Sequence, residues 1–226
     1  MSVLSADAIH SPRDLAPYLE HTLLAPGATS ADLERLCREA RAHGFVAVCV
    51  HREVAAEARR LLRGSAVKTV AVVDFPKGQG TIGQRVIEAL EAVRAGVDEL
   101  DIVAPLPALF AGRWQAVLED LRAVVRSVPL PVKVILETAL LDRDRKAAAA
   151  AIARCAGAAW VKTSTGFGGG GATAEDVALL REVVGEQLGV KASGGIRTAA
   201  DALAMIRAGA DRIGTSASVA IVSGSF

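Results

Sequence analysis

Short apolar runs rich in β-branched residues alternate along this chain with longer stretches in which apolar residues recur at helical spacing. This alternation is typical of a parallel sheet whose strands are connected by crossover helices. The turn that leads from a helix into the next strand repeats a glycine followed by a small or apolar residue, as at Gly44, Gly96, Gly157 and Gly209. We identify eight candidate strands, the number that closes a (β/α)8 barrel, or TIM barrel.

The boundaries of these elements follow from the same patterns. The strands are expected at residues 21–24, 45–50, 67–73, 99–103, 132–137, 160–163, 190–193 and 212–215. The helices are expected at residues 30–42, 52–62, 82–95, 114–127, 143–155, 174–188 and 199–208, with a short last helix after residue 218. We therefore predict an α/β protein with one TIM barrel domain over residues 1–226, in which residues 1–17 form a helical or irregular N-terminal extension. An open doubly wound sheet would need fewer strands and a nucleotide-binding fingerprint, which we do not find.

Charge and composition narrow the range of partners. The chain has 26 basic and 25 acidic residues, with no block of like charge and no interleaved aromatic residues, which argues against nucleic acid as a partner. We find no signal-peptide pattern and no apolar run of about 18 residues, so we expect a cytoplasmic protein without a membrane partner. The three cysteines are widely spaced, as fits a reducing compartment, and the four histidines form no zinc-binding pattern. We expect neither a metal nor a cofactor.

Two lysines, Lys162 and Lys191, lie at the ends of apolar strands and are followed by small, flexible residues. Because a buried ammonium is costly, such lysines suggest an amine whose pKa the protein lowers for covalent chemistry. A second ammonium about 4 Å away, at an effective dielectric constant of about 20, costs roughly 4 kcal/mol, equivalent to about 3 pKa units. The sequence therefore predicts an enzyme that forms a Schiff base.

Carboxylates on neighbouring strands could balance these lysines. Alternation along the strand directs Asp101 into the barrel, and Lys133 and Glu137 share the inward face of the next strand. Because buried charges should be paired, we expect one network of Asp101, Lys133, Glu137, Lys162 and Lys191. The alternative for Asp101 is a purely structural carboxylate.

Glycine-containing segments after the last strands predict a phosphate site. Residues 193–197 and residues 213–218 each combine small residues with the start of a helix, where the helix dipole favours an anion. They follow the seventh and eighth strands, the usual position for phosphate in this fold. The four glycines at 168–171 could approach a ligand or move as a lid, or they could form a solvated loop.

Seven motifs, in order along nearly the whole chain from about residue 18 to residue 222, resemble those of deoxyribose-phosphate aldolases. They are Glu-His-Thr-Leu-Leu (20–24), Val-Cys-Val (48–50), Asp-Glu-Leu-Asp-Ile-Val (98–103), Lys-Val-Ile-Leu-Glu-Thr (133–138), Val-Lys-Thr-Ser-Thr-Gly-Phe (161–167), Lys-Ala-Ser-Gly-Gly-Ile-Arg-Thr (191–198) and Arg-Ile-Gly-Thr-Ser (212–216). The fifth and sixth motifs are highly specific.

The resemblance implies a class I aldolase of deoxyribonucleotide and deoxynucleoside catabolism. Such an enzyme reversibly cleaves 2-deoxy-D-ribose 5-phosphate to D-glyceraldehyde 3-phosphate and acetaldehyde, without a metal, and members are often homodimers. By position, Lys162 would be the Schiff-base lysine, and Asp101 and Lys191 its proton-transfer partners. The implied substrate-pocket residues are Thr22, Cys49 and Thr165, and those at the phosphate are Gly166, Phe167, Gly194, Gly195, Arg197, Gly214 and Ser216.

The sequence departs from this family pattern at a few positions. Glu20 stands where the family usually has Asp, Asp74 where it usually has Gly, and Ala217 where many members have Ser. Some members end in a tyrosine that assists proton transfer, whereas this sequence ends in Phe226. We therefore expect protonation of the enamine not to depend on a C-terminal hydroxyl.

Two other functions stay open at this point. The first is a different class I aldolase whose donor is larger than acetaldehyde, which would still form the adduct on Lys162. The second is a non-catalytic barrel that binds sugar phosphates. It predicts stabilisation by the ligand without turnover.

Overall fold

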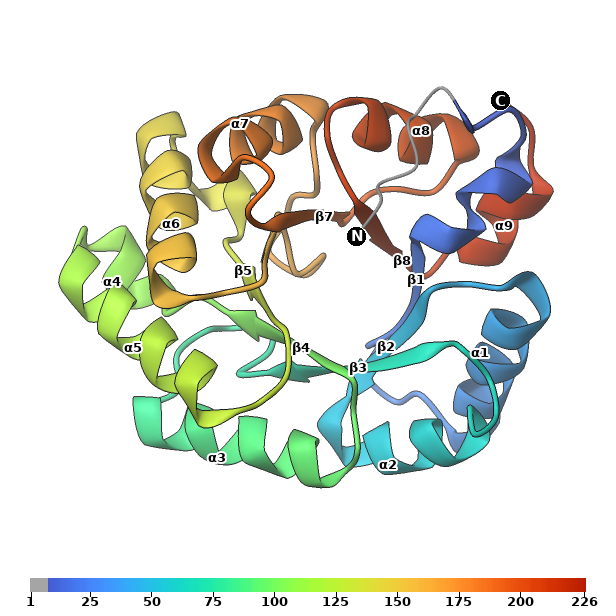
Figure 1. Cartoon of the computed structure of the whole chain (residues 1–226), viewed down its shortest axis with the longest axis horizontal. Helices are drawn as coiled ribbons and strands as arrows, with labels where there is room; N and C mark the ends of the chain where they lie inside the picture. Colours follow the sequence, from blue (N-terminus) through green and yellow to red (C-terminus); the bar gives the residue numbers. More distant parts are fainter. Residues whose placement is uncertain (1–7) are drawn as a thin grey trace.

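Eight parallel strands pair in chain order, and the first pairs with the last, so that the sheet closes into a barrel (Figure 1). The computed structural model describes residues 8–226. The strands are β1 (Leu19–Leu23), β2 (Ala47–His51), β3 (Lys68–Val73), β4 (Glu99–Val103), β5 (Val132–Ile135), β6 (Trp160–Lys162), β7 (Gly189–Ser193) and β8 (Arg212–Thr215). The TIM barrel prediction is confirmed.

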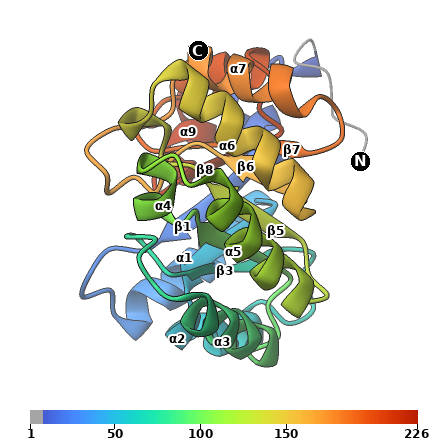
Figure 2. The same cartoon turned by 90° about the vertical axis from the view of Figure 1, so that its left-hand side faces the viewer.

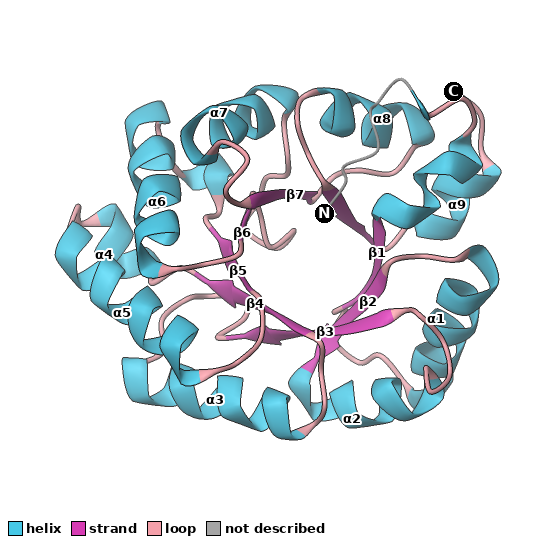
Figure 3. Ribbon diagram, viewed as in Figure 1, coloured by secondary structure: helices cyan, strands magenta, loops and turns pink. Residues whose placement is uncertain are grey.

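Helices form a ring around the barrel (Figure 3). They are α1 (Ser30–His43), α2 (Arg52–Leu61), α3 (Ile82–Arg94), α4 (Leu106–Phe110), α5 (Trp114–Ser127), α6 (Arg143–Ala156), α7 (Ala174–Val184), α8 (Ala199–Arg207) and α9 (Ser218–Ser223). From the side, α3, α5 and α6 lie next to one another over the strands (Figure 2). None of the helices over residues 8–226 is both long and apolar enough to cross a membrane.

Local sequence signals explain where several helices begin and end. The side chains of Thr29, Thr173 and Thr198 each accept a hydrogen bond from a backbone N–H in the first turn of the following helix. Gly44 and Gly157 end α1 and α6 in the left-handed conformation, which glycine adopts without a Cβ clash.

The observed elements differ from the expected ones in a few places. Helix α7 ends at Val184 and not at residue 188, and β5 ends at Ile135 because the backbone of Glu137 turns to a positive φ of 56°. Helix α4 and a 3-10 turn at Thr138–Leu140 were not expected. Of the expected N-terminal extension, residues 1–7 lie outside the described residues, and Pro12–Tyr18 forms a 3-10 turn that contacts α9.

The alternation of side chains along the strands separates two interiors. Outward-facing residues such as Leu100 and Ile102 join the apolar core between strands and helices, and both are fully buried. Inside the barrel, β2 and β3 contribute a small apolar cluster that includes Cys49 and Val70. The other six strands contribute charged side chains to the same interior. The fold therefore places a set of ionised groups at the centre of the protein.

Candidate active site

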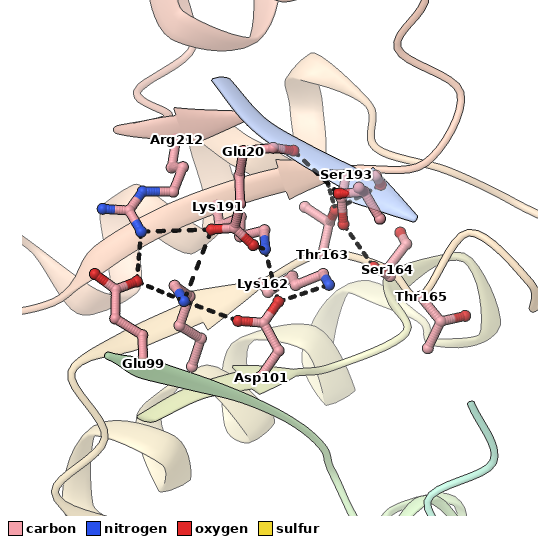
Figure 4. A network of polar contacts seen from close by, with 12 residues as sticks. Glu20, Glu99, Asp101, Lys162, Thr163, Ser164, Thr165, Lys191, Ser193 and Arg212 are labelled. Atoms are coloured by element: carbon pink, nitrogen blue, oxygen red, sulfur yellow. Dashed lines mark hydrogen bonds and ion pairs between the residues drawn. The ribbon is translucent and has the colours of Figure 1, made fainter. Parts of the chain in front are cut away.

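Seven charged side chains inside the barrel form one network, which we call the charge cluster (Figure 4). Its members come from six strands and are Glu20, Glu99, Asp101, Lys133, Lys162, Lys191 and Arg212. None is more than 3% exposed. Strand register accounts for part of the assembly, because Asp101 lies opposite Lys133, and Lys191 lies between Lys162 and Arg212 on neighbouring strands.

Asp101 is the centre of the charge cluster. One of its carboxylate oxygens, Oδ2, accepts hydrogen bonds from Lys162 at 2.8 Å and from Lys191 at 2.6 Å. The other oxygen, Oδ1, accepts from Lys133 at 2.9 Å. Burial alone would raise the pKa of this carboxyl, but the three ammonium groups outweigh burial and hold the pKa of Asp101 well below its usual range. Asp101 is therefore a carboxylate in the resting site.

Two of the lysines are held by more than one carboxylate. Lys191 donates to both Glu20 and Asp101, and Lys133 lies 2.7 Å from Glu99 and 2.9 Å from Asp101. Burial lowers the pKa of these amines, but the surrounding carboxylates outweigh it, so the pKa of Lys133 and that of Lys191 both lie above the usual value. Both lysines therefore stay charged.

Lys162 differs from the other two lysines in its carboxylate partners and in its access to a cavity. Among the described residues, its Nζ has one carboxylate partner, Asp101. It is also the one charged member of the cluster that lines the adjacent cavity, which has a volume of about 350 Å³. A small molecule in this cavity can reach the Lys162 amine, whereas Lys133 and Lys191 are fully buried. The geometry makes Lys162 the amine available for attack on a carbonyl.

The cavity brings together most of the residues that the sequence analysis assigned to substrate and phosphate. They are Thr22, Thr165, Gly166, Phe167, Gly194, Gly195, Arg197, Gly214 and Ser216. Cys49 is not among the lining residues in the described part of the chain. It lies fully buried beside the carboxylates of Glu20 and Asp101, and burial raises the pKa of its thiol to about 12.

The glycines between β7 and α8 form one wall of this cavity. Gly194 has a φ of 87°, and a Cβ there would lie 3.0 Å from the Cα of Gly171, so both its conformation and its surroundings favour glycine. At the helix start, the N–H groups of Arg197 and Thr198 donate to Asp201 at 3.1 and 3.0 Å. The loop glycines, more than the helix terminus, are thus positioned to contact an anion in the cavity.

Glu137 corrects the predicted network. Its carboxylate does not contact the lysines, because the positive φ at this residue turns the chain out of the strand. It accepts a hydrogen bond of 2.5 Å from Thr165 Oγ1 and further bonds from the Thr165 N–H. Ala172 N–H, beyond the four glycines, donates to Gly194 O at 3.0 Å. The glycine-rich segment is therefore anchored at both ends.

Three charged members of the cluster were absent from the predicted network. Glu99 shares the inward face with Asp101 by simple alternation, so the sequence held the signal for it. Arg212 likewise precedes Gly214 by two residues on the inward face of β8. Glu20, which stands where the family usually has Asp, accepts hydrogen bonds from Lys191 and Arg212. Its additional methylene does not remove it from the network.

The same region contains atoms spaced closely enough for a metal ion. Ligand atoms of Glu20, Cys49 and Asp101 lie within 4.8 Å of one another. Both carboxylates already contact lysine ammonium groups, however, and the thiol is protonated at neutral pH. A divalent cation would have to displace Lys191, so this donor set does not fit a resident metal.

Comparisons with known proteins agree with this geometry. The sequence model of the DeoC/LacD family of aldolases matches residues 18–224. A deoxyribose-phosphate aldolase from Thermotoga petrophila is 52% identical over 93% of this chain and 86% of its own length. One from Deinococcus radiodurans is 50% identical over 93% of this chain and 96% of its own length. The tetrameric deoxyribose phosphate aldolase from Aeropyrum pernix superposes with a TM-score of 0.89 at 37% identity, covering 96% of this chain and 93% of the other.

Proposed function

Because this chain belongs to the DeoC/LacD family of aldolases, we propose that it reversibly cleaves 2-deoxy-D-ribose 5-phosphate through a Schiff base on Lys162. The products are D-glyceraldehyde 3-phosphate and acetaldehyde, which places the reaction in the breakdown of deoxynucleosides and deoxyribonucleotides. The observation that carries the proposal is the position of Lys162. Its amine has a single carboxylate partner among the described residues and lines the cavity beside the loop glycines.

The first step forms the carbon–nitrogen bond. The neutral amine of Lys162 attacks C1 of the open-chain sugar, and loss of water from the carbinolamine leaves an iminium. Asp101 Oδ2 lies 2.8 Å from Nζ, so its carboxylate is the counter-ion next to this cation. Asp101 is also the nearest acceptor for protons that move during dehydration, and Lys191, on the same oxygen, keeps it oriented.

The second step breaks the bond between C2 and C3. Asp101, the carboxylate beside Lys162, accepts the proton of the C3 hydroxyl, directly or through a water molecule. C3 becomes the aldehyde of glyceraldehyde 3-phosphate, and the electron pair of the C2–C3 bond flows to the iminium to give an enamine. Protonation at C2 and hydrolysis then release acetaldehyde and the free lysine. The iminium loses its positive charge as the enamine forms and Asp101 loses its negative charge as it takes the proton, so the step leaves no unpaired charge in the buried cluster.

The phosphate is held at the other side of the cavity. Gly194, Gly195 and Gly214 offer close backbone approach, Ser216 offers a hydroxyl, and Arg197 offers a guanidinium at the rim. Holding the phosphate there would direct the aldehyde end of a five-carbon sugar toward Lys162. Ala217 adds no hydroxyl to this segment, whereas Ser216 lines the cavity.

Turnover of deoxyribose phosphate by the wild type and by Lys162→Arg tests the proposal. Arginine keeps the positive charge but cannot form the imine, because it stays protonated. We expect at least about a thousandfold loss of kcat in the variant. Comparable activity of the two proteins would contradict the mechanism.

Location and assembly stay predictions. We propose a cytoplasmic homodimer. The relative from Aeropyrum pernix is described as tetrameric, so light scattering on the purified protein should distinguish two subunits from four.

A further inference from the structure

Arg212 lies at the end of the charge cluster farthest from Lys162 (Figure 4). Its guanidinium donates to Glu99 at 2.5 Å and to Glu20 at 3.4 Å. The guanidinium carbon is also 4.6 Å from the centre of the Trp160 ring. The side chain is 2% exposed, so its charge is not screened by solvent. Arg212 thus has a fixed position and a fixed charge, because arginine does not lose its proton in proteins.

The charge cluster contains more cations than anions. Four cations, from three lysines and Arg212, face the three carboxylates of Glu20, Glu99 and Asp101. Lys68 also contacts Glu99, at 2.6 Å, but its side chain is 41% exposed and its charge is screened by solvent. The Cys49 thiol, which faces the cluster from β2, is neutral. With every lysine protonated, the buried set therefore carries one unit of excess positive charge.

The three lysines differ in their contacts with the carboxylates and with the cavity. Lys133 and Lys191 each touch two or more carboxylates, whereas Lys162 touches Asp101 alone among the described residues and borders the cavity. The excess charge therefore acts mainly on Lys162. Without Arg212, three lysines would already balance three carboxylates, and a neutral Lys162 would leave a buried negative charge.

We propose that Arg212 is a positioning residue that sets the pH above which Lys162 forms an imine, by supplying the positive charge that the three carboxylates do not neutralise. The inference rests on the proposed function of Lys162. Arg212 acts without touching the substrate, through the charge balance of the cluster.

Imine trapping across a pH series tests the proposal. Acetaldehyde and cyanoborohydride are added to the full-length protein at pH values from about 5 to 10, and the two-carbon adduct on Lys162 is quantified by peptide mass spectrometry. We expect Arg212→Met to move the midpoint of adduct formation upward by about one pH unit. One unit charge roughly 10 Å away, at an effective dielectric constant of about 20, gives a shift of that size.

Glu99→Gln makes the opposite prediction. It removes one carboxylate, raises the excess positive charge, and should move the midpoint downward. The double variant Glu99→Gln/Arg212→Met restores the wild-type charge balance, so its midpoint should return to within a few tenths of a unit of the wild type. Arg143→Met is the matched control, because it removes the same charge from a side chain that is 74% exposed on α6 and should not move the midpoint.

The outcomes separate the possible roles. Opposite shifts in the single variants and restoration in the double variant support the charge role. Midpoint shifts in the same direction, or no shifts, would overturn the charge role and leave Arg212 a structural residue. So would a double variant whose midpoint lies farther from the wild type than that of either single variant. Arg212→Met is used only if it unfolds cooperatively, which shows that it is folded. If it is not folded, the downward shift expected for Glu99→Gln tests the charge role by itself. Absence of any adduct in the wild type would instead refute the proposed function.

Discussion

Replacing Asp101 with Asn should lower the free energy of unfolding by about 3–5 kcal/mol at neutral pH. The change removes the anion that three buried ammonium groups share, at 2.6–2.9 Å. Lys133 and Lys191 keep other carboxylate partners but lose the carboxylate that they share. Breaking one buried ion pair costs about 3–5 kcal/mol because it leaves a charge without a partner. For a domain of this size, the corresponding fall in Tm is roughly 6–20 °C.

The pH dependence identifies the cause. In the wild type, the lowered pKa of Asp101 means that its contribution to stability is present above about pH 4 and is lost as the pH falls through its folded-state value. The raised pKa of Lys191 means that its contribution is present below about pH 10 and is lost as the pH rises through its folded-state value. Both contributions are complete at neutral pH.

In the variant, the carboxylate that raises the pKa of Lys133 and Lys191 is missing, so these amines should release protons at lower pH in the folded state. Deprotonation relieves the buried repulsion. The stability difference between wild type and Asp101→Asn should therefore shrink between about pH 7 and about pH 9.5.

Equilibrium unfolding in urea, followed by circular dichroism at those two pH values, measures this difference. Asp144→Asn is the control, because it removes the same charge from an exposed side chain and should change the stability by less than about 0.5 kcal/mol. A difference below about 1 kcal/mol for Asp101→Asn at neutral pH, or one that is the same at both pH values, would refute the reasoning.

Three further predictions concern the surroundings of the site. Iodoacetamide at about pH 8 should label the exposed Cys155 and spare Cys49, because burial raises the pKa of the Cys49 thiol to about 12. Peptide mass spectrometry measures both labelling rates, and similar rates would contradict this prediction. Gly194→Ala, at a φ of 87°, should weaken binding of inorganic phosphate by roughly 5- to 30-fold in calorimetry, and an unchanged Kd would argue against the loop as the anion site. Glu137→Gln should speed hydrogen exchange at residues 165–171, because the charged acceptor of Thr165 is lost, and unchanged protection would show that Glu137 does not anchor this segment.

The periodic parts of the fold could be predicted from the sequence because each strand and helix is specified locally. β4, β8 and α5 lie at the expected residues, since apolar periodicity and the flanking turns define them. β5 was predicted two residues too long, because apolar alternation continues to residue 136 while the backbone has already turned. Nothing in the sequence around Glu137 signals its positive φ, which a non-glycine residue adopts only rarely.

The central residues of the site could also be predicted from the sequence, whereas their surrounding partners could not. Lys162, Lys191 and Asp101 were placed in one cluster from alternation and strand order, and the structure brings them together. The surrounding partners depend on how the barrel closes. Arg212 and Glu99 come from strands far apart in the chain, and only the shear of the closed barrel brings their side chains to 2.5 Å. Pairing across a barrel interior is therefore a property of the closed sheet and not of either strand.

Borohydride reduction in the presence of acetaldehyde tests the central claim most directly. Reduction fixes an imine as a stable two-carbon adduct, and peptide mass spectrometry locates the modified amine. We predict one adduct per chain, on Lys162, with Lys133 and Lys191 unmodified. An unmodified Lys162, or an adduct on another lysine, would contradict the account.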